Sequence, residues 1–480
     1  MRRIRTTAVA TLALLNVFTI AAGVAVAHML PPRLAALRIP VTAARPLIGA
    51  GQVLAPAGTP TSATQSSAMP TRGGLATMLG AALPAADTGP SVGIEVTDAQ
   101  SGQVLYASDA AALATPGSTT KLVTAATALA VLGPEARFTT RVRQEGDTIV
   151  LVGGGDPTLA VNAYPSADYP RPATLATLAA STARALKAQG RGSVRLGYDT
   201  SLYSGPALAP GWTDAYISEG DVTPIVSLEA DQGRLTASGT FEDSDDPVNY
   251  RARTYDPAGM TATAFASLLA KDGVTVSSVT AESADGPVIA SVSSPPLAAI
   301  VEQMLQESNN VIAENLARHV AIAMGQPATF SGGATAELTE LRRLGVTTPI
   351  TLVDGSGLSP DDGIAPETLI RLLAVAAARP GLRDLITGLP VAGFSGTLSA
   401  GDSDFGGIGD LDGGVARGVV RAKTGNLSTI ASLAGLAYDR DGRLLIFAIM
   451  APDIPSSGLL QSAATAIDRA AAGLAACGCT

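Results

Sequence analysis

Histidine and cysteine are scarce in this chain of 480 residues, which contains two of each. His28 falls in or just after an N-terminal apolar run, so a Ser-His-Asp site would have to use His319. His319 lies in an expected helix over 311–324 and fits a helix surface or core better than a catalytic position. No H-E-x-x-H sequence occurs, which excludes a zincin. A serine enzyme built on this chain therefore needs another base, and a lysine that loses its proton can serve.

The two cysteines, Cys477 and Cys479, are too few for a disulfide framework or a tetrahedral zinc site. We expect a frayed C-terminal tail, and a Cys477–Cys479 bridge is the alternative in an oxidising compartment. The acidic run that begins at Asp402 resembles the start of a calcium loop, but Gly406 and Gly413 occupy two of its ligand positions. We therefore expect neither a metal nor a cofactor.

Charged and aromatic residues are also few, at 15% and 4%, against 46% hydrophobic residues. The core must therefore be aliphatic, and wholesale disorder is excluded. The net charge of −9 argues against a nucleic-acid partner, because phosphate binding needs a basic surface. The length allows two or three domains.

The N-terminus predicts export from the cytoplasm. Arg2, Arg3 and Arg5 precede an apolar run over 7–27 that ends in Ala-Val-Ala. This pattern fits a signal peptide over 1–29, or an uncleaved membrane anchor of the same extent; a buried helix is a weaker reading. Both of the first two readings place the rest of the chain outside the cytoplasm. Residues 30–84 have the Pro- and Ala-rich composition of a linker.

Folded sequence is expected in two parts of one body, 85–138 and 293–480, with a β-rich insertion over 139–292. In the body we expect strands over 92–97, 103–106, 419–424, 429–438 and 444–450, and helices over 118–132, 297–305, 311–324 and 457–476. In the insertion we expect strands over 148–153, 193–198 and 222–228, and one helix over 173–189.

Three short motifs occur in these settings. Ser118-Thr-Thr-Lys121 begins a helix, and residues three apart share a helix face. Ser308-Asn309-Asn310 lies between two helices, and Lys423-Thr424-Gly425 lies at a strand. Each alone has an ordinary structural explanation: a helix cap with a solvated lysine, a polar turn, and a strand end. Their joint occurrence in this order is more informative than any one of them.

In order and context the three motifs resemble those of the serine penicillin-recognising enzymes, the D,D-peptidases and serine β-lactamases. The long interval between Lys121 and Ser308 resembles the interval between the same motifs in the D-alanyl-D-alanine carboxypeptidase/endopeptidase family. This family is of the penicillin-binding protein 4 type and comprises the low-molecular-mass class C proteins. Further stretches agree with that family over about residues 85–470: Asp98–Tyr106, Gly154–Leu159, Pro210–Trp212, Ser308–Glu314, Asp354–Ser359 and Gly396–Leu398.

The resemblance implies an α/β (α+β) fold of the β-lactamase/transpeptidase type, with an antiparallel sheet flanked by helices and a large β-rich insertion between the first two motifs. Two positions differ in detail from the usual pattern. Asn309 stands where the family carries Asp or Asn, and Asn426 stands where Thr is usual. At position 426 the family uses the backbone N–H, so the different side chain removes no central group.

The resemblance also implies roles for the motif residues. Ser118 is the nucleophile and Lys121 its base, whose pKa must fall from about 10.4 to ~7–8. Burial supplies part of that shift, and the charge of Lys423 is expected to supply more. Ser308 passes a proton to the leaving amine, and Asn310 holds the substrate amide and orients Lys121.

The remaining positions are expected to bind substrate. Lys423 and Thr424 grip a terminal carboxylate, and Gly425 lets the substrate approach the backbone. The backbone N–H groups of Ser118 and Asn426 form an oxyanion hole. Asp214, after Trp212, either meets the side-chain amine of diaminopimelate or is an ordinary turn residue.

The expected partners are peptidoglycan stem peptides ending in D-Ala-D-Ala, with β-lactam antibiotics as covalent inhibitors and no nucleic acid. A membrane contact is expected only through an uncleaved N-terminal segment. The balance of carboxypeptidase and endopeptidase activity stays open. The alternatives are a serine β-lactamase, a catalytically weak wall-binding protein of the same fold and a general esterase.

Overall fold

The computed structural model describes residues 68–163, 169–235, 252–283, 285–399 and 414–479. The expected leader, most of the expected linker and the acidic run at 402–407 lie outside the described residues. Within the described ranges, no helix is both long enough and apolar enough to span a bilayer.

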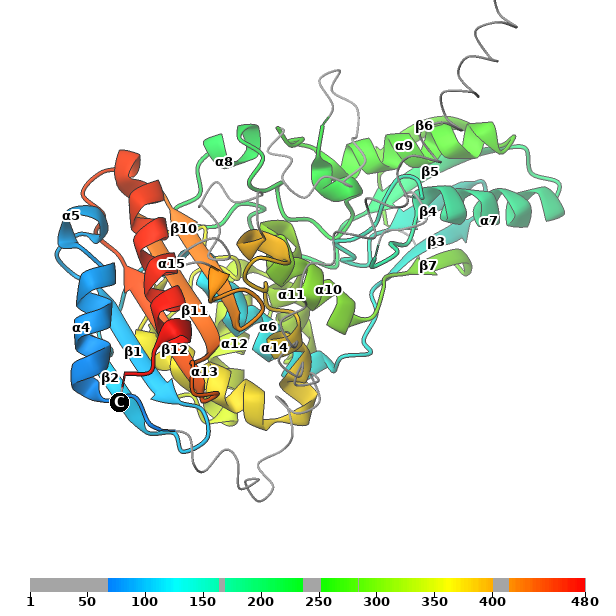
Figure 1. The fold of residues 1–480 in the computed structure, drawn as a ribbon. Coiled ribbons are helices and arrows are strands. Elements are labelled where there is room, and N and C mark those ends of the chain that lie inside the picture. The colour runs from blue at the N-terminus through cyan, green and yellow to red at the C-terminus, as the bar shows by residue number, and fades with distance from the viewer. Residues whose placement is uncertain (1–67, 164–168, 236–251, 284, 400–413, 480) are drawn as a thin grey trace, which may run out of the picture. The chain divides into compact units, whose positions relative to one another are not determined.

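A five-stranded antiparallel sheet forms the centre of the body, in the order β10-β11-β12-β1-β2 (Figure 1). The strands are β1 (Gly93–Asp98), β2 (Val104–Ser108), β10 (Val420–Leu427), β11 (Ile430–Tyr438) and β12 (Leu444–Ala451). The N-terminal hairpin joins the last strand, with Val96 opposite Phe447. Every residue of β1 is buried, and all but one of β11. Strands buried on both faces need helices on both sides of the sheet.

One face of this sheet is covered by α15 (Leu460–Ala476) and α4 (Arg72–Ala82), which pack side by side (Figure 1). Leu75 and Leu79 of α4 are buried in the same core as Ile467 of α15. The short helix α5 (Ala85–Thr88) follows α4. The end of the expected linker is thus a packed helix, since its leucines recur four residues apart and line one face.

The other face carries helices from the middle of the chain, among which α13 packs on β1 and β12. The helices are α6 (Lys121–Leu132), α10 (Leu297–Gln306), α11 (Asn310–Ala323), α12 (Phe330–Leu344), α13 (Pro366–Ala378) and α14 (Arg383–Thr387). Single 3-10 turns are η1 (Gly117–Thr120), η3 (Pro380–Leu382), η4 (Gly396–Leu398) and η6 (Ser457–Leu459), and β8 (Ile350–Thr351) pairs with β9 (Gly363–Ile364). The architecture confirms the expected fold class.

A second five-stranded sheet lies between the first two motifs, in the order β6-β5-β4-β3-β7. Its elements are β3 (Thr139–Glu145), β4 (Thr148–Val152), α7 (Leu175–Ala188), β5 (Ser193–Asp199), α9 (Pro257–Lys271), β6 (Thr275–Ala281) and β7 (Val288–Ser293). Between β5 and α9 lie α8 (Ala215–Ser218) and the turn η2 (Asp231–Gly233). The pairs β4–β5 and β5–β6 are parallel, so α7 and α9 are the crossover helices that parallel strands need.

Two expectations for this inserted segment were wrong. A second long helix, α9, was not expected; its signal was Asp256, whose side chain accepts from the Gly259 N–H at 2.9 Å, followed by Pro257 at the first helical position. Residues 222–228 form no strand. Pro224 within that run has no N–H to donate to a strand ladder.

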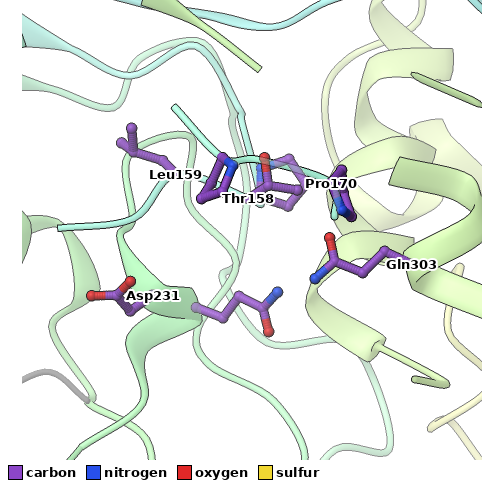
Figure 2. A pocket seen from close by; sticks show the side chains of 8 residues that line it. Thr158, Leu159, Pro170, Asp231 and Gln303 are labelled. Atoms are coloured by element: carbon purple, nitrogen blue, oxygen red, sulfur yellow. The ribbon is translucent and has the colours of Figure 1, made fainter. Parts of the chain in front are cut away.

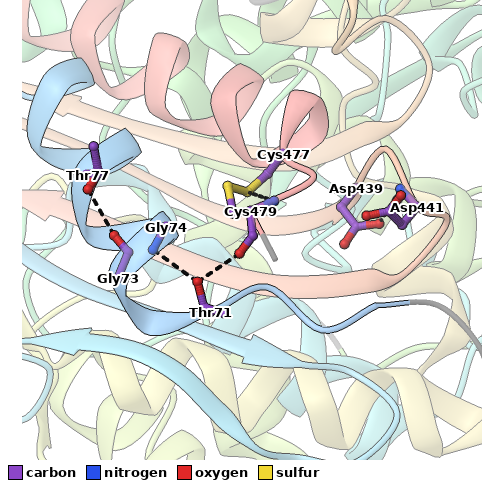
Figure 3. The surroundings of a disulfide bond; sticks show 8 residues. All are labelled: Thr71, Gly73, Gly74, Thr77, Asp439, Asp441, Cys477 and Cys479. Atoms are coloured by element: carbon purple, nitrogen blue, oxygen red, sulfur yellow. Dashed lines mark hydrogen bonds between the residues drawn. A yellow bond between two sulfur atoms is a disulfide. The ribbon is translucent and has the colours of Figure 1, made fainter.

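The C-terminal tail is ordered and not frayed, contrary to expectation. Cys477 and Cys479 form a disulfide, and Cys477 is buried (Figure 3). The Cys479 carbonyl accepts from the backbone N–H of Thr71 at 2.6 Å and from its hydroxyl at 2.9 Å. Thr71 caps α4 by accepting from the Gly74 N–H. The tail is thus held by hydrogen bonds to a segment that is distant in sequence.

Candidate active site

The first motif occupies η1 and the first turn of α6. Gly117 precedes it with φ of +54°, a conformation that favours glycine. The Lys121 Nζ donates to Ser118 Oγ at 2.9 Å, so the two side chains meet on one helix face. Ser118 is half-buried, whereas Lys121 is fully buried. The hydroxyl is therefore reachable from solvent while the amine beside it is not.

Three oxygens surround the Lys121 amine. Besides Ser118 Oγ, these are Asn310 Oδ1 at 2.6 Å and the Ser356 carbonyl at 2.7 Å. They come from η1, α11 and the loop after β8, three segments that are distant from one another in sequence. Because an ammonium or amine with three fixed partners cannot rotate away, Lys121 is held against the serine.

Burial lowers the pKa of Lys121 to about 7, while the charges of Asp354 and Glu314 act in the opposite direction. Burial also lowers the pKa of Lys423 well below its usual range, and the Lys121 charge lowers it further. We expected Lys423 to act on Lys121. In the structure the dehydrated site is the main cause for Lys121, because burial disfavours the charged form.

The second motif forms the junction between α10 and α11. Ser308 has φ of +56°, which is uncommon for a residue with a Cβ and is found at functional sites. Asn309 caps α11 by accepting from the Ile312 N–H at 3.1 Å. Asn310 reaches Lys121 with its oxygen, and its Nδ2 donates to the Asp221 carbonyl at 2.9 Å. The inserted segment thus fixes which end of the amide faces the lysine.

The third motif lies on β10 and touches the second. Lys423 is buried, and its Nζ donates to Ser308 Oγ at 2.9 Å and to the Thr424 carbonyl at 2.9 Å. The Thr424 hydroxyl pairs with that of Thr397 at 3.1 Å. The structure thereby links the second motif to the third, and the first to the second through Asn310 and Lys121.

Gly425 lets β10 pass close to the turn that carries Ser118. A Cβ there would collide with the Pro116 carbonyl oxygen and would lie 3.0 Å from the Thr119 nitrogen. A Cβ on Gly117 would lie 3.2 Å from the Asn426 nitrogen. The lack of a side chain at both glycines permits this approach, which places the Asn426 nitrogen beside the Ser118 turn.

Asp214 is exposed at the start of α8, and its backbone carbonyl accepts from the Tyr255 hydroxyl at 3.4 Å. Trp212, two residues earlier, donates from Nε1 to Asp354 Oδ2 at 2.8 Å. The loop that carries Asp214 is therefore bound to the loop that contacts Lys121.

The sequence model of the D-Ala-D-Ala carboxypeptidase 3 (S13) family matches residues 79–251 and 230–475. The chain belongs to this family. It is 39% identical over 355 residues to carboxypeptidase DacB of Mycolicibacterium smegmatis, with 72% of each chain covered. It is 37% identical to a carboxypeptidase of Mycobacterium tuberculosis, over the same shares. This S13 member is thus a serine-type carboxypeptidase, a hydrolase.

The fold of the S13 chain is similar to that of penicillin-binding protein 4 from Haemophilus influenzae. The TM-score is 0.65 at 22% identity, and the match covers 82% of this chain and 98% of that structure. At this identity the likeness concerns the fold alone.

His319 contributes to packing. Its ring stacks on Phe138 with centroids 3.8 Å apart, and its Nε2 lies 2.9 Å from the Gly155 carbonyl oxygen. Burial lowers its pKa to about 4, so the ring is neutral at neutral pH. Among the described residues no cluster of His, Cys, Asp and Glu suits a metal ion.

Asp354–Ser359 and Thr397 contribute to the family resemblance, but no role was expected for them. Both segments touch the site, through the Ser356 carbonyl on Lys121 and the Thr397 hydroxyl on Thr424. Gln232 was missed altogether; its Oε1 accepts from Asn309 Nδ2 at 2.8 Å. The D-G-S-G run was a usable signal, but nothing in sequence marked Gln232.

A cavity of about 20 Å³ lies beside Gln232, between Asp231 and Gln303 (Figure 2). This volume suits one water molecule, so the cavity is too small for a peptide. A peptide substrate must instead reach the half-buried hydroxyls of Ser118 and Ser308 from outside.

Proposed function

We propose that this S13 peptidase removes the terminal D-Ala from peptidoglycan peptides through a Ser118 acyl-enzyme, on the cell-wall side of the membrane. The observation that carries the proposal is the 2.9 Å hydrogen bond between Ser118 Oγ and a buried Lys121 amine whose pKa is about 7. An amine with that pKa is substantially neutral at pH 7–8 and can accept a proton. β-Lactams are proposed to acylate the same hydroxyl.

In the first step Lys121 takes the Ser118 proton as Oγ attacks the carbonyl carbon of the penultimate D-Ala. The developing oxyanion is proposed to accept from the N–H groups of Ser118 and Asn426. Such donors each contribute around 100-fold or more in rate. The close approach at Gly117 and Gly425 supports this pairing, because it places the two backbone segments side by side.

The C–N bond then breaks, and the leaving amine needs a proton. Ser308 is proposed to deliver its own hydroxyl proton and to recover one from the Lys121 ammonium, which returns Lys121 to the neutral amine; Ser308 Oγ is hydrogen-bonded to Lys423, and Ser308 neighbours Asn310, a partner of Lys121. Water then attacks the ester and gives a proton to Lys121, and Lys121 passes that proton to Ser118 Oγ as the ester C–O bond breaks, which restores the free serine and the neutral amine. If the leaving group is a cross-linked diaminopimelate, the same steps give an endopeptidase.

Lys423 and Thr424 are proposed to bind the terminal carboxylate. The Lys423 amine is buried, and its pKa is lowered by that burial. A bound carboxylate would raise its pKa again, because an opposite charge favours the ammonium. A substrate with a free carboxylate thus favours the charged form of Lys423, which binds that carboxylate.

We expect Lys423→Met to lower kcat/KM for a peptide with a free D-Ala carboxylate about 100-fold more than for its C-terminal amide. Methionine fills a similar volume without charge. D-Ala release, or D-alaninamide release for the amide, gives both rates. Equal losses on the two peptides would show that Lys423 does not bind the carboxylate, as expected for a general esterase.

Asp214 is proposed to meet the side-chain amine of diaminopimelate, because it is exposed on the loop that Trp212 joins to the site. We expect Asp214→Ala to lower kcat/KM about fivefold for a peptide with that free amine and not for the acetylated peptide. Glu219→Ala, another exposed acid beside α8, is the matched control. An unchanged ratio between the two peptides leaves Asp214 as a turn residue.

Residues 139–292 are proposed as a separate inserted domain, and residues 1–29 as a leader or an anchor. N-terminal sequencing of protein recovered from cells distinguishes cleavage from retention. A chain that begins at Met1 after recovery contradicts the cleaved form.

A further inference from the structure

Asp354 lies at the centre of the loop that contacts Lys121. Its Oδ1 accepts from the backbone N–H groups of Ser356 at 3.1 Å and Gly357 at 2.6 Å. Its Oδ2 accepts from the Ser359 N–H at 2.7 Å and from Trp212 Nε1 at 2.8 Å. Asp354 is 2% exposed, so these four donors replace its water shell.

Gly355 and Gly357 hold the same loop against α11, α6 and the Ser118 turn. The Gly355 N–H donates to Glu314 of α11, and the Gly355 carbonyl accepts from Thr124 of α6 at 2.7 Å. Gly357 has φ of +83°, and a Cβ there would collide with the Gly117 carbonyl. The loop is thus packed directly against the turn that carries Ser118. Its Ser356 carbonyl is the group that receives the Lys121 amine.

We propose that Asp354 is a positioning residue for acyl transfer: its carboxylate shapes the loop that holds the Lys121 amine, and through Trp212 it couples that loop to the inserted segment. This inference rests on the proposed function. It assigns no contact between Asp354 and substrate. Trp212 of the inserted segment thereby helps to hold Lys121 through Asp354. Neither Trp212 nor Asp354 belongs to the three motifs.

Several charged groups face Lys121 besides Asp354. They are Glu314 from α11, Asp362 from the same loop, Asp221 from the inserted segment and Lys423 from β10. Glu337 from α12 faces Asp354. Asp354 is first among the carboxylates that raise the pKa of Lys121 against the effect of burial. Removing its charge therefore lowers that pKa.

The test is Asp354→Asn, measured as the rate of acylation by fluorescent penicillin from pH 5 to 9. The amide keeps the shape but cannot accept from all four donors, so we expect about a 100-fold lower rate at pH 8. We also expect the acidic limb of the profile to move about one unit to lower pH. A change in packing alone would lower the rate and leave the limb in place.

Glu314 can offset part of that shift. Burial and the Asp354 charge raise its pKa to about 8, so loss of the Asp354 charge lets Glu314 ionise more readily. The double variant Asp354→Asn/Glu314→Gln removes this compensation and should move the limb further. A limb at the wild-type pH in both variants would overturn the proposal.

Trp212→Phe separates the hydrogen bond from the charge. The ring and its edge contact with Phe330 can remain, while the donor to Asp354 is lost. We expect about a tenfold lower acylation rate with the limb unmoved. An unchanged rate would remove the coupling to the inserted segment, and this variant decides that point even if Asp354→Asn fails to fold.

Asp361→Asn is the matched control, because Asp361 is exposed in the same loop region. Its profile should equal that of the wild type. Trp212 is the only tryptophan, so in the variants that keep it its emission reports whether the surroundings of the indole have changed. If wild-type protein is not labelled at all, the proposed function fails; if it is labelled and the limb does not move, only this inference fails.

Discussion

We expect Ser118→Ala to abolish covalent labelling by fluorescent penicillin and D-Ala release. The variant removes the proposed nucleophilic atom, and among the described residues no other hydroxyl is hydrogen-bonded to the Lys121 amine. Tryptic mapping of the labelled wild-type protein should place the adduct on the peptide that contains Ser118. The effect should be complete within detection, and stability should hardly change, because a half-buried hydroxyl is lost.

Ser267→Ala, an exposed serine on α9, is the control and should label like wild type. Labelling that survives in Ser118→Ala contradicts the assignment of the nucleophile. A wild-type adduct that hydrolyses within seconds, with rapid nitrocefin turnover, would favour a β-lactamase over a peptidase.

We expect Lys121→Ala to lower the acylation rate about 1,000-fold, within the range typical of the loss of a general base. In the wild type the amine must be unprotonated, so the rate rises as pH increases through about 7, the pKa of Lys121. In the variant this limb should disappear. Stopped-flow acylation across pH 5 to 9 measures both.

Lys121→Met guards against a cavity artefact, because it fills the buried site without an amine and should show the same loss. Lys271→Ala, exposed in the last turn of α9, is the control. If Lys121→Met is acylated at a rate within a few-fold of the wild-type rate, the proposal that Lys121 is the base is contradicted.

The three motifs could be read from the sequence because they depend on local spacing. Ser118 and Lys121 meet through the helix period, Ser308 falls between two helices with clear apolar patterns, and Lys423 falls within a strand. The strands 429–438 and 444–450 were confirmed, since strands buried on both faces read as nearly continuous apolar runs.

Local pattern was insufficient where a residue's partner is remote in sequence. The leucines of α4 looked like linker because their partner, α15, is at the other end of the chain. The tail at Cys479 was expected to fray because its partner, Thr71, is equally distant. Helix α9 was overlooked because its apolar face packs on a sheet whose strands lie both before and after the helix in the sequence.

By itself, the sequence determined that Ser118 and Lys121 share a helix face and that histidine is scarce, because these follow from residue identity and helical spacing. Only the tertiary structure decided how the amine is prepared for the proposed role of base. Burial among Asn310, Ser356 and Ser118 lowers its pKa, and the loop around Asp354 holds it in place. Dehydration and contacts between remote segments depend on the whole packed body, and no local pattern encodes them.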